Sequence, residues 1–118
     1  MGKLTTHVLD TAAGIPARGM RIDLHRIAND GSAVPLSTHN TNADGRVSSP
    51  LLQGRKLRAG RYTLTFHVAA YFRAIGFDLP APAFLDDVVV RFGIADASAH
   101  YHVPLLVSPW SYSTYRGS

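Results

Sequence analysis

Apolar and polar residues alternate in several short segments of this chain, and that alternation restricts what it can fold into. Residues 20–26 show it most strictly, with Met, Ile and Leu alternating with Arg, Asp and His. A period of two sends successive side chains to opposite faces of an extended strand. Comparable segments, separated by turns rich in Gly, Pro, Asn and Asp, predict further strands at 4–10, 34–41, 46–52, 60–67, 86–92, 101–107 and 112–115.

One segment breaks this period. Residues 68–75 contain three alanines and the pair Tyr71 and Phe72, and Gly76 follows directly. This is typical of a short helix with a glycine just beyond its end, which we place at 69–75. Seven or eight short strands with one short helix predict an all-β fold, a two-sheet antiparallel sandwich.

Length and composition favour a single domain over residues 1–118. The chain is 46% hydrophobic and 17% charged, as soluble globular proteins are. No run approaches the ~18 apolar residues that a membrane helix needs, and residues 1–6 contain no apolar signal core. Because the chain has no cysteine, disulfides and thiolate chemistry are excluded. We expect a cytoplasmic protein without a membrane partner.

The net charge of +4 raises the question of a nucleic-acid partner. The basic residues are scattered, however, and only 55–61 forms a cluster, beside glycines. Nucleic-acid modules normally combine such charge with a recognition helix or an aromatic platform, and neither pattern is present. We therefore expect no nucleic-acid partner, and interpret the arginines as solvated residues with a few that bind small anions.

Several histidines lie within the expected strands. His7 alone is best explained as a histidine on a polar strand face. His100 and His102 are two apart and share a face, a spacing that metal ligands also use. With no cysteine and only Asp96 as a nearby carboxylate, a structural zinc site lacks ligands. The other histidines, at positions 25, 39 and 67, are interpreted as structural or surface residues.

The last residues are unusual for the end of a chain. Tyr115, Arg116, Gly117 and Ser118 follow a strand-like segment directly and bring an aromatic ring, a guanidinium and a carboxylate. Chain ends are usually frayed and polar. This ending is more easily explained as part of a site.

Four segments together resemble the 5-hydroxyisourate hydrolases, the purine-catabolic relatives of transthyretin. They are Leu-Thr-Thr-His-Val-Leu-Asp at 4–10, Gly-Ile-Pro-Ala at 14–17, Thr-Asn-Ala-Asp-Gly-Arg at 41–46 and the whole of 100–118. The resemblance runs from residue 4 to residue 118, and the closing Tyr-Arg-Gly-Ser is the signature of the family. Transthyretin shares the sandwich and a segment similar to 108–114, but it lacks the histidine–arginine set and this ending.

The resemblance implies a transthyretin-like sandwich and a homotetramer whose sites lie in a channel between dimers. It implies hydrolysis of 5-hydroxyisourate to 2-oxo-4-hydroxy-4-carboxy-5-ureidoimidazoline in urate degradation. The catalytic residues carried over are His7, Arg46 and His102. The substrate-binding residues carried over are His100, Tyr115, Arg116, Gly117 and Ser118.

The residue types fit this chemistry. Two histidines can serve as general base and acid, and a guanidinium can stabilise charge on an anionic ring. We expect direct attack by water on the lactam carbonyl, with no metal and no organic cofactor. Two other classes stay open from the sequence: a module that binds a flat aromatic ligand without converting it, and a purely structural sandwich.

Overall fold

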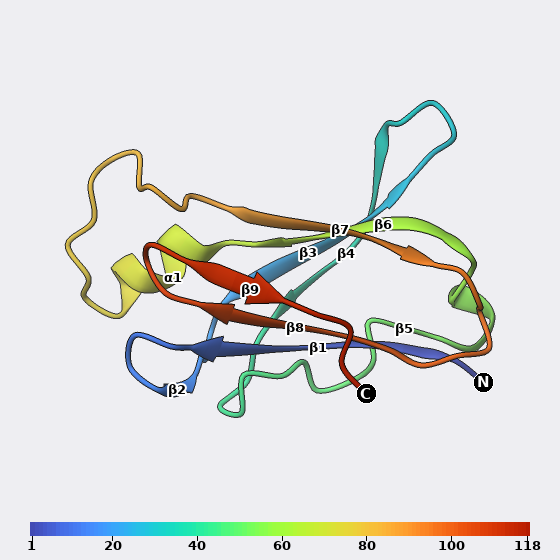
Figure 1. Cartoon of the computed structure of the whole chain (residues 1–118), viewed down its shortest axis with the longest axis horizontal. Helices are drawn as coiled ribbons and strands as arrows, with labels where there is room; N and C mark the ends of the chain where they lie inside the picture. The colour runs from blue at the N-terminus through green and yellow to red at the C-terminus, as the bar shows by residue number, and fades with distance from the viewer.

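The computed structural model describes all 118 residues as two β-sheets packed face to face, with one helix at an end of the sandwich (Figure 1). The first sheet contains β1 (Lys3–Asp10), β2 (Ile15–Pro16), β5 (Leu52–Gln53), β8 (Tyr101–Val107) and β9 (Tyr112–Thr114). The second contains β3 (Arg21–Ile27), β4 (Ala33–Asn40), β6 (Gly60–Phe66) and β7 (Val88–Ile94). The 3₁₀ helix η1 (Gly54–Lys56) and the α-helix α1 (Val68–Ala74) complete the fold. The expected two-sheet sandwich is confirmed.

Strand order explains how distant segments meet. The first sheet has the order β2-β1-β8-β9, with β5 also paired to β1, and the second has the order β4-β3-β6-β7. All pairs are antiparallel except β1 and β8, which run parallel, so the expected antiparallel sandwich contains one parallel pair. Parallel strands need a long connection, and here almost the whole chain lies between the two partners.

The core lies between the sheets and is filled by alternate residues of the strands. The largest fully buried side chains include Tyr62 and Phe66 of β6 and Phe72 of α1. Full burial of such a side chain stabilises the fold by roughly 1.5–3 kcal/mol. The opposite face of each sheet does not contribute to this core and can carry polar side chains. None of the helices is long and apolar enough to cross a membrane.

Most predicted elements are close to their expected positions. The strand at 101–107 coincides with β8, and the helix expected at 69–75 is α1, displaced by one residue. The prediction of a strand at 46–52 is wrong, because only a single bridge at Arg46 and the two-residue β5 form there. Pro50, which has no N–H to donate, interrupts that segment.

Candidate active site

Strands β1 and β8 place two histidines on the outer face of the first sheet. The parallel register sets Thr5 opposite His102 and His7 opposite Pro104. The even-numbered residues of β1 are buried in the core, so Thr5 and His7 face outward. His102 is half-buried between two buried neighbours on β8. Both histidines therefore lie on one face, two positions apart along the strands.

Arg46 reaches the same face from the turn that follows β4. The Oδ1 of Asn42 accepts a hydrogen bond from the Arg46 N–H at 3.2 Å. Gly45 has φ +74°, and a Cβ there would collide with the carbonyl oxygen of Val8. Only glycine fits this position, because both the backbone conformation and the close approach exclude a side chain. The turn thereby sets Arg46 beside His7, with which it forms an isolated antiparallel bridge.

His102 is held from two sides. Its Nδ1 lies 2.8 Å from the Thr5 Oγ1 in a hydrogen bond. Its carbonyl oxygen accepts the Gly117 N–H at 2.7 Å, and a Cβ on Gly117 would lie 2.5 Å from the His102 Cδ2. The φ of Gly117 lies outside the left-handed region, so the backbone conformation does not require glycine here. The reason for glycine is the contact of the backbone with the imidazole ring.

The electrostatics keep both imidazoles neutral. Desolvation by burial and the Arg46 charge lower the pKa of His7, outweighing the Asp44 backbone and carboxylate, which raise it. Desolvation by burial, followed by the charges of Arg46 and His7, lowers the pKa of His102. These couplings mean that the three side chains sense one another's charge. At neutral pH each imidazole can therefore accept a proton.

A cleft of about 310 Å³ opens beside His102. It is lined by Lys3, Thr5, His100, Tyr101, His102 and Ser118. Sequence reasoning placed His100 and Ser118 in the site, and both line this cleft. It missed Lys3 and Thr5, although counting back in steps of two from His7 along the strand identifies both as residues of the same face.

Two residues assigned to the site lie elsewhere in this protomer. Tyr115 and Arg116 line a separate cavity of about 250 Å³ that also contains residues of β7. The Arg116 Nη2 donates a hydrogen bond to the His100 carbonyl at 3.1 Å. Its guanidinium carbon lies 4.2 Å from the centre of the Tyr101 ring, a cation–π contact. Within one chain the structure thus brings together His7, Arg46 and His102, but not the Arg116 guanidinium.

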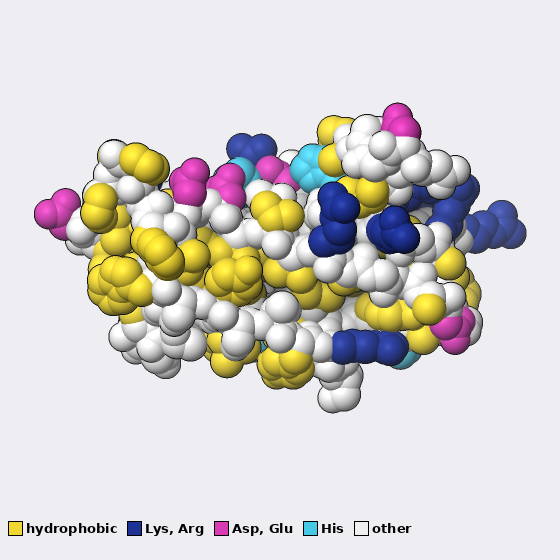
Figure 2. Space-filling view, turned by 45° about the horizontal axis from the view of Figure 1, so that its top comes forward, with side chains coloured by type: hydrophobic (Ala, Val, Ile, Leu, Met, Phe, Trp, Pro, Cys, Tyr) yellow, Lys and Arg dark blue, Asp and Glu magenta, His cyan; other side chains and the backbone are white.

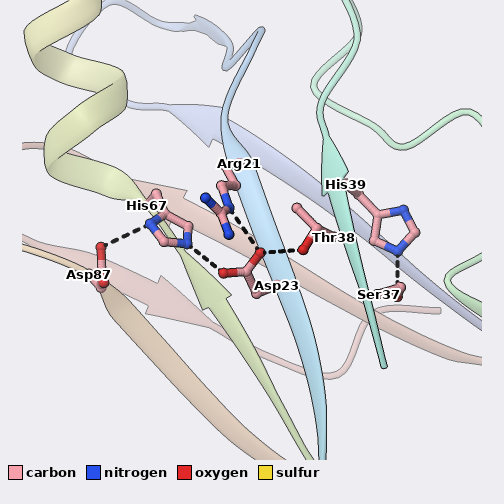
Figure 3. A network of polar contacts seen from close by, with 7 residues as sticks. All are labelled: Arg21, Asp23, Ser37, Thr38, His39, His67 and Asp87. Carbon is pink, nitrogen blue, oxygen red and sulfur yellow. Dashed lines mark hydrogen bonds and ion pairs between the residues drawn. The ribbon is translucent and has the colours of Figure 1, made fainter. Parts of the chain in front are cut away.

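A second polar cluster occupies the outer face of the other sheet (Figure 3). Asp23 is bonded to His67 at 2.8 Å, to Arg21 at 3.1 Å and to Thr38 at 2.9 Å. The Nδ1 of His67 also lies 3.4 Å from a carboxylate oxygen of Asp87. The cluster links β3 and β4 to the residue before α1 and the residue before β7, which agrees with the structural interpretation of His67. No three His, Asp, Glu or Cys side chains are grouped so as to hold a metal ion.

Comparisons with known proteins agree with this fold. The model of the HIUase/Transthyretin family matches residues 4–117. The chain is 63% identical to the 5-hydroxyisourate hydrolase of Ralstonia nicotianae over the full length of both proteins. It superimposes on all of the 5-hydroxyisourate hydrolase of Klebsiella pneumoniae with TM-score 0.82 and 35% identity.

A solved transthyretin has the same fold. Sea bream transthyretin in complex with thyroxine matches with TM-score 0.87 and 28% identity, over 98% of this chain and 94% of that one. The expected transthyretin-like sandwich is confirmed, and so is the resemblance found in the sequence motifs. The chain belongs to the HIUase/Transthyretin family.

Proposed function

We propose that this protein hydrolyses 5-hydroxyisourate to 2-oxo-4-hydroxy-4-carboxy-5-ureidoimidazoline. One observation carries the proposal: His7, Arg46 and His102, from three distant segments, converge on one outer face of the sheet. Support comes from the full-length relative at 63% identity, which is named for this reaction. A structural sandwich has no need of such a group of polar side chains.

The chemistry follows from the residue types. One neutral imidazole removes a proton from water while the water oxygen bonds to the lactam carbonyl carbon. The Arg46 guanidinium stabilises the negative charge that develops on the carbonyl oxygen. As the ring C–N bond breaks, the imidazole that now carries the proton taken up from water donates it to the leaving nitrogen. General acid and base catalysis typically contribute ~10²–10⁴-fold each.

We further propose a homotetramer in which this face is covered by a second copy. The unpaired edge strands β7 and β9 carry exposed apolar side chains, with Val89 at 54% and Tyr112 at 47% exposure. Trp110, in the loop between β8 and β9, is also exposed. Covering the site would exclude water and strengthen its electrostatics. Sedimentation of an active monomer at micromolar concentration would contradict this arrangement.

The direct test follows the decay of freshly generated 5-hydroxyisourate against its spontaneous rate. We expect fast decay with the protein, and loss of turnover by at least about 10²-fold in His7→Ala, Arg46→Ala and His102→Ala. His25→Ala is the matched control, because His25 is a half-buried strand histidine on the other sheet. We expect it to retain full turnover, and we expect a chelator to leave the wild-type rate unchanged.

The second candidate function is binding of a flat aromatic ligand without conversion. It is favoured by the match to sea bream transthyretin, which was solved with thyroxine. Decay of 5-hydroxyisourate at the spontaneous rate, together with saturable binding of thyroxine, would favour this alternative. Wild-type turnover in any of the three alanine variants would instead remove that residue from the mechanism.

A further inference from the structure

The largest cavity of the molecule lies away from His7, His102 and Arg46. It is a cleft of about 580 Å³ at the end of the sandwich opposite α1, between the β3–β4 hairpin and the segment from β5 to β6 (Figure 1). Arg26 and Leu36 line it from the hairpin, and Leu52, Arg55, Lys56 and Arg58 from the opposite side. None of the site residues described above lines this cleft.

Its four cationic side chains have no counterion. Arg21 is the only Lys or Arg side chain of the whole chain that forms an ion pair. No acidic residue occurs between Asp44 and Asp78, while six Lys and Arg residues do. Figure 2 shows the same imbalance, with Lys and Arg gathered on the right of the view, towards the β3–β4 hairpin, and most Asp on the left. Like charges gathered without a counterion repel one another, and a bound polyanion would remove that repulsion.

The residue types define the anion further. Three of the four cations are arginines, whose planar forks bind phosphate oxygens with two parallel hydrogen bonds. Leu36, which is 43% exposed, and the buried Leu52 give the cleft an apolar wall beside the charges. A cleft of this volume, with convergent charges and apolar walls, has the size of a small-molecule site.

We propose that this cleft binds a small polyanion with a chain of two or three phosphate groups. The phosphate chain spans Arg26 on the hairpin and the cations at 55–58, and any organic part lies against Leu36. This proposal does not rest on the hydrolysis proposed above, because the two sites share no residue.

Titration calorimetry at low ionic strength tests the proposal, with inorganic triphosphate, ATP and orthophosphate as ligands. We expect saturable binding of triphosphate and ATP and at least tenfold weaker binding of orthophosphate. Equal affinity of triphosphate and ATP would identify the phosphate chain alone as the ligand. Tighter binding of ATP would add its nucleoside as a contact with the apolar wall. Because these ligands are charged, the affinity must fall as salt increases.

The variants assign the binding to the cleft. We expect Arg55→Gln/Arg58→Gln to weaken triphosphate binding at least tenfold, and Lys56→Gln to weaken it several-fold. Arg61→Gln is the matched control, because Arg61 is exposed nearby on β6 but does not line the cleft. The proposal is overturned by absence of triphosphate binding, by equal binding of orthophosphate, or by affinity unchanged in the double variant. Tighter binding of an aspartate-rich peptide or an oligonucleotide would also overturn it, since the ligand would then be a macromolecule.

Discussion

Replacement of Gly117 by alanine tests whether the C-terminal segment positions His102. The added Cβ would lie 2.5 Å from the His102 Cδ2, and ordinary contact distances begin at 3.4 Å. Either the imidazole or the terminal segment must therefore move by about 0.9 Å. A misplacement of ~1 Å of a catalytic group can reduce the rate about 10²-fold. We expect Gly117→Ala to lower kcat by about that factor.

The same substitution should hardly affect stability. The only backbone hydrogen bond at risk is the one from the Gly117 N–H to the His102 carbonyl, 2.7 Å long. A bond of this kind contributes about 0.5–1.5 kcal/mol. Since the terminal residues are mostly exposed, the core stays intact. The free energy of unfolding in urea should change by no more than about 1.5 kcal/mol.

Three measurements decide the outcome: kcat, unfolding in urea, and the pKa of His102 from its NMR titration. Burial is the largest cause of the lowered pKa of His102, so displacement of the ring or of the terminus must raise that pKa towards its ordinary value. Gly93→Ala is the control. Like Gly117, Gly93 has an ordinary φ, but unlike Gly117 it has open space around its Cβ position. A Gly117→Ala protein with wild-type kcat would refute the positioning role.

Three further predictions involve pH. The lowered pKa values of His7 and His102 keep both rings neutral, so kcat/KM should hold from pH 8 to 6.5 and fall only below pH 6.5. Thr5→Val should lower kcat about tenfold and shift the pH below which kcat/KM falls. Thr5→Ser should keep both quantities at their wild-type values. If that pH is unchanged in Thr5→Val, the role of the 2.8 Å hydrogen bond between Thr5 and His102 is contradicted. Desolvation raises the pKa of Asp23, but hydrogen bonds from His67, Arg21 and Thr38 outweigh that effect and lower the pKa to about 2. The stabilising contribution of the Asp23 carboxylate is therefore present above pH 3.8 and lost as pH falls towards 2. Asp23→Asn should lower the free energy of unfolding at pH 7, measured in urea, by about 1 kcal/mol after solvent screening.

Much of the fold was predictable because alternation reports local geometry. The strand at 101–107 and the short helix before Gly76 follow from patterns within ten residues. The parallel pairing of β1 with β8 was not predictable in this way, because it depends on the packing of two sheets and on a connection of almost the whole chain. In 46–52 the local signal was present but outweighed by the alternation: Pro50 disfavours a full strand, and the segment forms little more than one bridge.

The site shows the same division. The alternation of β1 is enough to place Thr5 on the face of His7, but the hydrogen bond to His102 requires the parallel register. The glycine at position 117 indicates only that a side chain is disfavoured there. Whether the reason is an unusual φ or a close neighbour is visible only when the imidazole of β8 is in place.

The outer face of the first sheet explains how one sandwich can support different functions. The core takes every second residue of β1 and most of β8, where Pro104 is also buried, and half-buried outward positions such as His7 and His102 can vary with less effect on packing. In this chain those positions hold two imidazoles, and a glycine-dependent turn adds a guanidinium. In the proposed hydrolase these groups act on the substrate ring, whereas sea bream transthyretin, with the same fold, was solved holding thyroxine. We therefore expect the difference between catalysis and binding to lie in a few outward side chains, and substitutions there should lower turnover at least about 10²-fold and leave the free energy of unfolding almost unchanged.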